Sequence, residues 1–362
     1  MDFITNFLKG FFNLIADPRL YFGLMVVALV LMVWKREIFI SKAVGYGLLF
    51  FLTLFFALGG LDPNFQLIIT KPDNVPIVGL IFLLVFFTWY SMREAVLNDQ
   101  RIARGDGPIE KVESDRVWVW PDLVYTELIA LILCTVVLIV WSILLKAPLE
   151  QPANRAVTPN PSKAPWYFLG LQEMLVYFDP WLAGVVLPGL IIVGLIAIPY
   201  IDKNPKGNGY YTFAERKVEI TMFLFGFVIL WSSLIVLGTF LRGPNWNFFG
   251  PFEYWDTHKL EALTNVNLAE YIWVRGLRTG LPSFWLTREI FGIVLVLVYV
   301  FVLPLVLARR WFRGYYEKMG APRYYVGVLL FLMMMSLPAK MLMRWIFNLK
   351  YIVAIPEFFF NI

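Results

Sequence analysis

Eight long apolar runs are the feature of this 362-residue sequence that most constrains its fold. Most are close to the roughly 20 residues that an α-helix needs to cross a bilayer. A helix satisfies its backbone hydrogen bonds internally, so such runs predict membrane-spanning helices. The runs cover residues 20–34, 43–60, 76–92, 123–145, 181–200, 218–241, 284–307 and 324–347. The sequence therefore predicts an all-α, polytopic transmembrane protein with about eight spans.

The composition supports a membrane protein and excludes an ordinary soluble domain. Hydrophobic residues make up 59% of the chain and charged residues only 16%, whereas soluble domains carry about 25% charged residues. The net charge of +5 could suggest nucleic acid, but the basic residues cluster in short loops, as the positive-inside rule requires. We therefore expect lipids and no nucleic acid as partners. We place the chain in a bacterial inner (cell) membrane as a multi-pass protein with both termini outside.

The chain divides into four predicted segments. Residues 1–110 hold three spans after a short helix, whose apolar residues from Phe3 to Ile15 recur at amphipathic spacing. Residues 118–241 hold three spans, residues 242–283 form an outer loop, and residues 284–362 hold the last two spans. Between Trp246 and Trp255 the outer loop carries six aromatic residues, which would leave a costly exposed patch in water. We expect this loop to fold over the outer face.

Few residues could hold a cofactor. The one cysteine, Cys134, lies inside an apolar run, so the chain has neither a disulfide framework nor a cysteine-based metal motif. A membrane b-type haem held by two imidazoles needs two histidines, and this chain has only His258. We expect no cofactor bound by this chain alone and no metal site, so any haem belongs to a partner.

A proline-rich link leads into an aromatic helix start. Pro159, Pro161 and Pro165 disfavour helix in the residues that precede them, so we expect the helix to begin near Trp166. Trp166 and Tyr167 then lie at a membrane–water boundary, each with a flat apolar face and one polar hydrogen. A site for a quinone ring needs that combination, whereas an aromatic pair that merely anchors a helix shows the same pattern.

Residues 118–241 contain an ordered series of motifs. They are Trp118-Val-Trp-Pro-Asp-Leu-Val-Tyr125, Pro148-Leu-Glu-Gln-Pro-Ala-Asn154, Pro165-Trp-Tyr-Phe168, Trp181-Leu-Ala-Gly184 and Pro199-Tyr-Ile-Asp202. This series resembles the C-terminal half of cytochrome b, which occurs alone as subunit IV of the cytochrome bf complex. The resemblance implies a three-helix unit in the middle of the chain, with additional N- and C-terminal transmembrane helices around it.

The resemblance also implies a function. It suggests a haem-free subunit of a bc-type quinol:cytochrome c oxidoreductase, in a complex that is dimeric. The implied partners are a haem-bearing cytochrome b N-terminal-half subunit, a Rieske iron–sulfur protein and a cytochrome c subunit. Quinol binds at their interface, is oxidised in an outer pocket that includes Pro165, Trp166, Tyr167 and Phe168, and releases its protons outside. An inner quinone site would include Asp122, whose alternative role is to cap a helix after Pro121.

The sequence departs from the family at the pocket motif. The family has Pro-Glu-Trp-Tyr, whose glutamate accepts a quinol proton, and here Ala164-Pro165-Trp166-Tyr167 stands in its place. Glu173 follows Trp166 by seven residues, so a helix places both on one face and Glu173 could act as the catalytic base. Alternatively, Glu173 faces a lipid headgroup or another subunit. A rival reading of the whole chain is a transporter or a purely structural membrane subunit.

Overall fold

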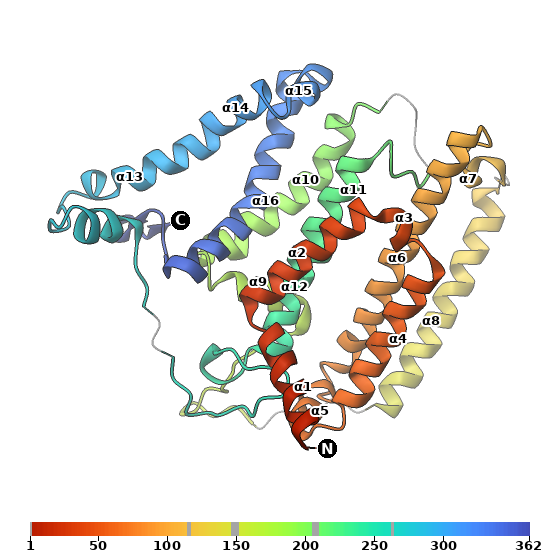
Figure 1. Ribbon diagram of the computed structural model, residues 1–362, viewed down its shortest axis with the longest axis horizontal. Coiled ribbons are helices and arrows are strands. Elements are labelled where there is room, and N and C mark those ends of the chain that lie inside the picture. Colours follow the sequence, from red (N-terminus) through yellow and green to blue (C-terminus); the bar gives the residue numbers. More distant parts are fainter. Residues whose placement is uncertain (1, 114–116, 146–151, 205–209, 262–263) are drawn as a thin grey trace. The chain divides into compact units, whose positions relative to one another are not determined.

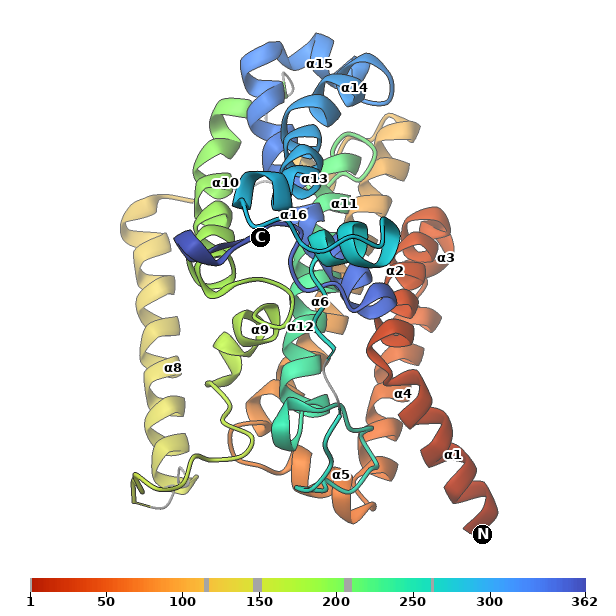
Figure 2. The ribbon, with the colours of Figure 1, turned by 90° about the vertical axis from the view of Figure 1, so that its left-hand side faces the viewer.

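The computed structural model describes residues 2–113, 117–145, 152–204, 210–261 and 264–362, which are mostly helical (Figures 1 and 2). Residues 148–151 of the second motif lie outside the described residues. Among these described residues, seven helices are long and apolar enough to cross a membrane. An eighth span is reached if the pair Phe3–Ile15 and Pro18–Trp34, bent by 78°, counts as one. The prediction of an all-α, polytopic membrane protein is confirmed.

By packing, the chain forms two compact units, each of which combines segments distant in sequence. The first unit comprises residues 1–27, 163–207 and 223–362, and the second comprises residues 28–162 and 208–222. The helices α2 (Pro18–Trp34) and α11 (Lys217–Phe223) each run from one unit into the other. The predicted segments were contiguous, whereas residues 118–241 contribute to both packing units.

The second unit is a set of helices around a close pair. Its elements are α3 (Arg36–Phe39), α4 (Lys42–Gly59), α5 (Pro63–Ile69), α6 (Val75–Arg104), α7 (Ile109–Val112), η1 (Val119–Leu123) and α8 (Val124–Leu144). α4 and α6 lie side by side (Figures 1 and 2). A Cβ at Gly45 would fall 2.2 Å from the Trp89 ring, so glycine is needed for this approach. Residues 125–144 of α8 are all exposed.

The first unit holds the C-terminal spans and the proposed pocket motif. Its elements are α1 (Asp2–Ile15), α9 (Trp166–Met174), η2 (Leu182–Val186), α10 (Leu187–Ile201), η3 (Leu224–Trp231), α12 (Ser232–Val236), η4 (Leu237–Leu241), η5 (Pro244–Trp246), η6 (Glu270–Gly276), α13 (Trp285–Leu297), η7 (Val298–Val302), α14 (Leu303–Arg309), α15 (Arg313–Met319), α16 (Ala321–Phe347), β1 (Ala354–Ile355), η8 (Pro356–Phe358) and β2 (Phe360–Asn361). β1 and β2 pair antiparallel. Pro188 has no N–H to donate, and the wider π-helical turn η2 directly precedes it.

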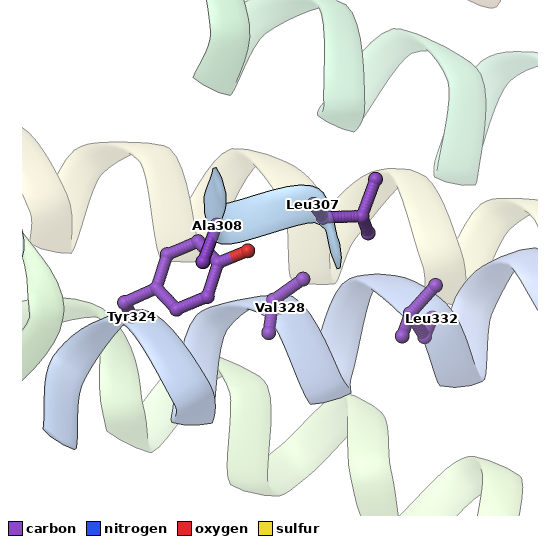
Figure 3. Packing of buried hydrophobic residues seen from close by; sticks show 5 residues of the cluster. All are labelled: Leu307, Ala308, Tyr324, Val328 and Leu332. Carbon is purple, nitrogen blue, oxygen red and sulfur yellow. The ribbon is translucent and has the colours of Figure 1, made fainter. Parts of the chain in front are cut away.

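The last two spans form a hairpin joined by α15. Where α14 meets α16, a buried apolar cluster fixes the pair (Figure 3); it comprises Leu307, Ala308, Tyr324, Val328 and Leu332. The Tyr324 hydroxyl donates to the Pro304 carbonyl at 3.0 Å. Toward the other end, the segment after α16 presses against α13, because a Cβ at Gly292 would lie 2.0 Å from the Ile352 carbonyl oxygen.

The aromatic outer loop is packed against the rest of its unit, and its covering of the outer face stays a prediction. Phe249 is buried, and its backbone N–H donates to the Leu241 carbonyl at 3.0 Å. The loop also packs on α1: the backbone N–H of Phe252 donates to the Asn13 side chain at 3.0 Å. The Phe12 and Phe252 rings lie 6.1 Å apart. The last turns of α1 therefore hold this loop.

Candidate functional site

The helix α9 begins at Trp166, where the proline-rich link predicts a helix start. Pro165 is extended and precedes the first turn. The side chain of Gln172, on the last turns, accepts from the backbone N–H of Ala164 at 2.9 Å and closes the link onto the helix. Lys163 donates to the Thr239 carbonyl at 2.9 Å and lies 4.7 Å from the Trp255 ring centroid. The approach to α9 is thus tied to the end of η4 and to the outer loop.

The start of α9 presents an aromatic surface. Tyr167 and Phe168 are 57% and 50% exposed, and Trp166 is half-buried. The rings meet edge to face: the Trp166–Tyr167 centroids lie 5.8 Å apart and the Tyr167–Phe168 centroids 5.4 Å. Two adjacent exposed aromatics leave flat apolar area that the chain itself does not cover. The surface can stack on a planar ring and offers the phenol of Tyr167 for a hydrogen bond.

The opposite face of α9 is packed tightly against the helix from η3 to η4. Leu169, Gly170, Glu173 and Met174 are buried. A Cβ at Gly170 would lie 3.3 Å from the Trp231 ring, and a Cβ at Gly238 would lie 3.1 Å from the Leu169 carbonyl oxygen. The helix is fixed by these contacts, so the aromatic surface has a rigid support.

Glu173 belongs to the packed face. At 100° per residue it shares a side with Trp166, as predicted, but lies about 120° around the helix from Tyr167 and about 10 Å further along the axis than Trp166. Its side chain is fully buried within the chain. The alternative that it faces a lipid headgroup or another subunit therefore does not describe this geometry.

Both carboxylate oxygens of Glu173 are held by donors. Arg242 makes a forked pair, with Nη2 at 2.7 Å from Oε1 and Nε at 2.9 Å from Oε2. The indole N–H of Trp246 donates to Oε2 at 3.2 Å, and the Tyr177 hydroxyl donates to Oε1 at 3.2 Å. Forked arginine–carboxylate pairs are among the strong charge-assisted hydrogen bonds. Four donors offset the cost of taking this carboxylate out of water.

Arg242 in turn organises the outer loop. It follows the last residue of η4 directly and is itself buried. Its Nη1 donates to the Trp246 carbonyl at 2.7 Å, and its guanidinium carbon lies 3.6 Å from the Phe248 ring centroid. Trp246 has a positive φ of 58°, a conformation that costs a non-glycine residue of the order of 1–3 kcal/mol. The contacts of its carbonyl and indole with the ion pair hold it there.

The segment after α9 anchors the C-terminal segment. Lys350 donates to the carbonyls of Leu175 and Val176 at 3.3 and 3.2 Å. Asp179 accepts from the hydroxyl of Tyr351 at 3.0 Å. Burial, and then repulsion from Arg344, lowers the pKa of Lys350, and Asp179 opposes this. Burial raises the pKa of Tyr351 to about 12.

Burial, and next the charge of Glu173, raises the pKa of Tyr177 well above its usual range. Tyr177 therefore stays a neutral donor to the carboxylate. Its ring meets that of Trp345 edge to face at 6.1 Å, which connects the ion pair to α16. The carboxylate, its donors and the last span form one polar cluster behind the aromatic surface.

Asp122 lies in the other unit, in η1 at the start of α8. Its side chain is exposed and makes no capping hydrogen bond to the helix. Its backbone carbonyl accepts from the Thr126 hydroxyl at 2.9 Å. The geometry thus gives no support to the capping role, and the quinone-site role stays a prediction. Glu127, one turn further, is also exposed.

Sequence reasoning did not find Arg242, Trp246 or Tyr177 as partners of Glu173. Arg242 is 69 residues away in the chain, and no periodicity connects residues that far apart. One signal was present: Arg242 lies at the end of a span that the sequence predicts to be the outer one, and an arginine there runs against the positive-inside rule. An arginine in such a place is expected to pair with a carboxylate. Within the described residues, no group of three or more histidine, cysteine, aspartate or glutamate side chains could hold a metal ion.

In a comparison with known protein families, residues 152–249 match the family model described as Cytochrome b(C-terminal)/b6/petD. The matched residues include the link, α9, the spans α10 and α11–η4, Arg242 and Trp246. α8 and Asp122, which the sequence resemblance included, lie outside them. No solved structure matches the chain.

Proposed function

Because the chain contains a cytochrome b C-terminal-like unit, we propose that it is a haem-free membrane subunit of a respiratory quinol:cytochrome c oxidoreductase of the bc type. Its partners are then a haem-bearing cytochrome b N-terminal-half subunit, a Rieske iron–sulfur protein and a cytochrome c subunit, in a dimeric complex. The observation that carries this proposal is the surface at the start of α9, inside the matched residues: Pro165, Tyr167 and Phe168 are exposed and Trp166 is half-buried.

The role of this surface is to bind and orient the quinol ring. The Tyr167 and Phe168 rings are perpendicular, so the flat face of one of them can stack on the quinol ring, and the Tyr167 hydroxyl can hydrogen-bond a quinol oxygen. Oxidation of the quinol to quinone would release two protons outside and two electrons, for which the partners' haem b and iron–sulfur cluster would be the acceptors. The packing of α9 on Gly170 and Gly238 keeps the surface in place.

The role of Glu173 follows from its contacts. As a base it would have to accept a proton while Arg242, Trp246 and Tyr177 occupy both of its oxygens. Its geometry therefore supports a positioning role: it ties α9, the end of η4 and the outer loop into one rigid wall of the pocket. Proton acceptance by Glu173, which the sequence predicts, stays a prediction that experiment can separate from this role.

α8 and Asp122 complete the proposal on the inner side. α8 buries none of its residues in this chain, so its surface is available to lipid and to the haem-bearing partner. Asp122, exposed at the start of α8, is proposed to line the inner quinone site. There it would hydrogen-bond a quinone oxygen and take part in proton uptake.

The proposal is tested by quinol:cytochrome c reductase activity of the purified complex. Tyr167→Ala removes the most exposed ring of the surface and should lower kcat/KM by about tenfold or more, since a stacked aromatic and one hydrogen bond together contribute about 1–3 kcal/mol. Tyr254→Ala, which removes a tyrosine that is 76% exposed in the outer loop, is the matched control. Equal activity of the two variants and the wild type would contradict the proposal.

A double variant separates the two roles of Glu173. Glu173→Leu combined with Arg242→Leu removes the carboxylate without leaving a buried unpaired charge. If Glu173 positions the wall, the double variant keeps activity within about tenfold of the wild type, whereas loss of a general base costs about 10²–10⁴ in rate. A loss of that size, in a complex with normal haem content, would assign proton acceptance to Glu173.

A further inference from the structure

An apolar pocket lies in the C-terminal part of the chain, outside the residues that match the family model. It has a volume of about 250 Å³. It is lined by Leu268 just before η6, Tyr271 on η6, Leu295 on α13, Met343 and Phe347 on α16, and Leu349 and Ile352 after α16. In Figure 1 these elements are the teal and blue segments around the label C. The close approach of the Ile352 backbone to Gly292 forms one edge of this space.

The chemistry of the lining selects an alkyl chain. Tyr271 carries the one side-chain polar group among the lining residues, and its hydroxyl donates to the Phe347 carbonyl. A ring with carbonyl or hydroxyl groups would lose hydrogen bonds in such a space, whereas a hydrocarbon chain loses none. The volume is also below the roughly 300–1,000 Å³ of typical small-molecule pockets. It suits part of a flexible chain.

A cation lies at the rim of the pocket. The guanidinium of Arg275 stacks on the ring of Tyr271, with its central carbon 4.7 Å from the ring centroid. Arg275 is exposed, and among the described residues no carboxylate forms an ion pair with it. One ring of the pocket wall therefore carries a positive charge on its outer face.

The pocket lies beside the end of the span α16. Phe347 is the last residue of the span α16, and α13 begins the preceding span in the same end of the hairpin. The rim residues Val274 and Leu277 on either side of Arg275 are 46% and 54% exposed. A short segment with exposed apolar residues and arginine is typical of structures that rest in the headgroup region.

From this arrangement we infer that the pocket binds an anionic phospholipid, with an acyl chain between α13, α16 and η6 and its phosphate on Arg275. The apolar lining accepts the chain, and the rim charge selects the headgroup. Bound lipid fills the space that the diverging ends of α13 and α16 leave, and so links the hairpin to η6. The site does not depend on quinol chemistry.

The test uses the purified complex, stripped of loosely bound lipid and titrated with phosphatidylglycerol or phosphatidylcholine. Bound lipid is counted by native mass spectrometry. The wild type should retain phosphatidylglycerol about fivefold more tightly, the size of effect expected from one arginine near an anionic headgroup. Arg275→Gln should abolish this preference, and Lys318→Gln, which removes an exposed cation on α15, should leave it unchanged.

A second pair of variants tests the pocket itself. Leu295→Trp fills the space and should lower retention of both lipids, whereas Leu305→Trp, at an exposed position on α14, should not. Equal retention of the two lipids by the wild type would overturn the inference. So would a Leu295→Trp variant that keeps its phospholipid but loses co-purified quinone, because the pocket would then hold the isoprenoid tail.

Discussion

In the sequence, α8 precedes the proline-rich link and α9 follows it. The two helices differ in how far their side chains are buried and hydrogen-bonded within this chain. α9 buries Glu173 completely and gives it four hydrogen bonds from within the chain. α8 has 21 residues, none of them buried, and Glu127 is exposed in its first turn. The buried carboxylate of α9 therefore has its partners within this chain, whereas the side chains of α8 find theirs outside it.

The difference indicates that α9 contributes to the folding of this chain and that α8 contributes to contacts with its surroundings. A carboxylate with internal partners contributes to the stability of the isolated chain. A carboxylate at the start of an apolar span needs water, lipid headgroups or another protein. Substitutions on α9 should thus act on folding, and substitutions on α8 should act on assembly.

The largest effect should come from breaking the ion pair. Glu173→Leu leaves Arg242 buried without its counter-charge and should cost about 3–5 kcal/mol in the free energy of unfolding, measured by denaturation in detergent. The double variant with Arg242→Leu should recover most of this loss. Glu127→Leu on α8 should leave the stability of the isolated chain unchanged. Equal losses at Glu173 and Glu127 would remove the distinction between the two helices.

A smaller loss is expected when one donor of the carboxylate is removed. Trp246→Phe keeps an aromatic ring, smaller than the indole, and deletes the indole N–H, and a hydrogen bond to a charged group contributes about 1.5–3 kcal/mol. Thermal unfolding should show this loss, and limited proteolysis should cleave the outer loop faster. Trp118→Phe, at an exposed tryptophan before η1, is the matched control. A stable variant with an unchanged loop would show that Trp246 does not hold it.

A change in packing volume should have a more modest effect. Gly238→Ala places a methyl group 3.1 Å from the Leu169 carbonyl oxygen, and overpacking of this kind costs about 1–3 kcal/mol. We expect the lower part of that range, because α9 can shift by a few tenths of an ångström. Ala130 is exposed on α8, so Ala130→Val should change the free energy of unfolding very little. The two unfolding midpoints give the comparison directly.

The smallest perturbation uses the chain's one cysteine as a probe. Cys134 lies on α8 and is exposed. A membrane-permeant alkylating reagent should modify it in the isolated chain and react more slowly in the intact complex, if the proposed haem-bearing partner covers α8 there. Equal labelling rates in both would mean that this face of α8 meets lipid alone.

Much of the local structure could be predicted from the sequence. The apolar runs give the spans, Pro165 gives the start of α9, and the seven-residue spacing places Trp166 and Glu173 on one face. These features depend on short-range rules of backbone geometry and on the length of a bilayer crossing. The first run is at the lower limit of length for a span. It forms α2, which is 17 residues long and bends by 78° from α1.

The polar contacts of the site could not be predicted in the same way. The pairing of Glu173 with Arg242 joins residues far apart in sequence, and the side chain of Trp246 reaches it only because its backbone adopts a positive φ. The anchoring of residues 348–353 on α13 and on the segment after α9 depends on tertiary packing as well. The charge of a residue and the hydropathy of its neighbours show that a buried charged residue needs partners. They do not show which residues those partners are.

A reduced-minus-oxidised absorption spectrum of the complex purified through this chain, and of the chain alone, tests the central claim most directly. The account predicts b-type haem bands in the complex and none in the isolated chain, since His258 alone cannot supply two imidazole ligands. A complex without haem, or haem bands in the isolated chain, would contradict the assignment of this protein as the haem-free subunit of a quinol-oxidising complex.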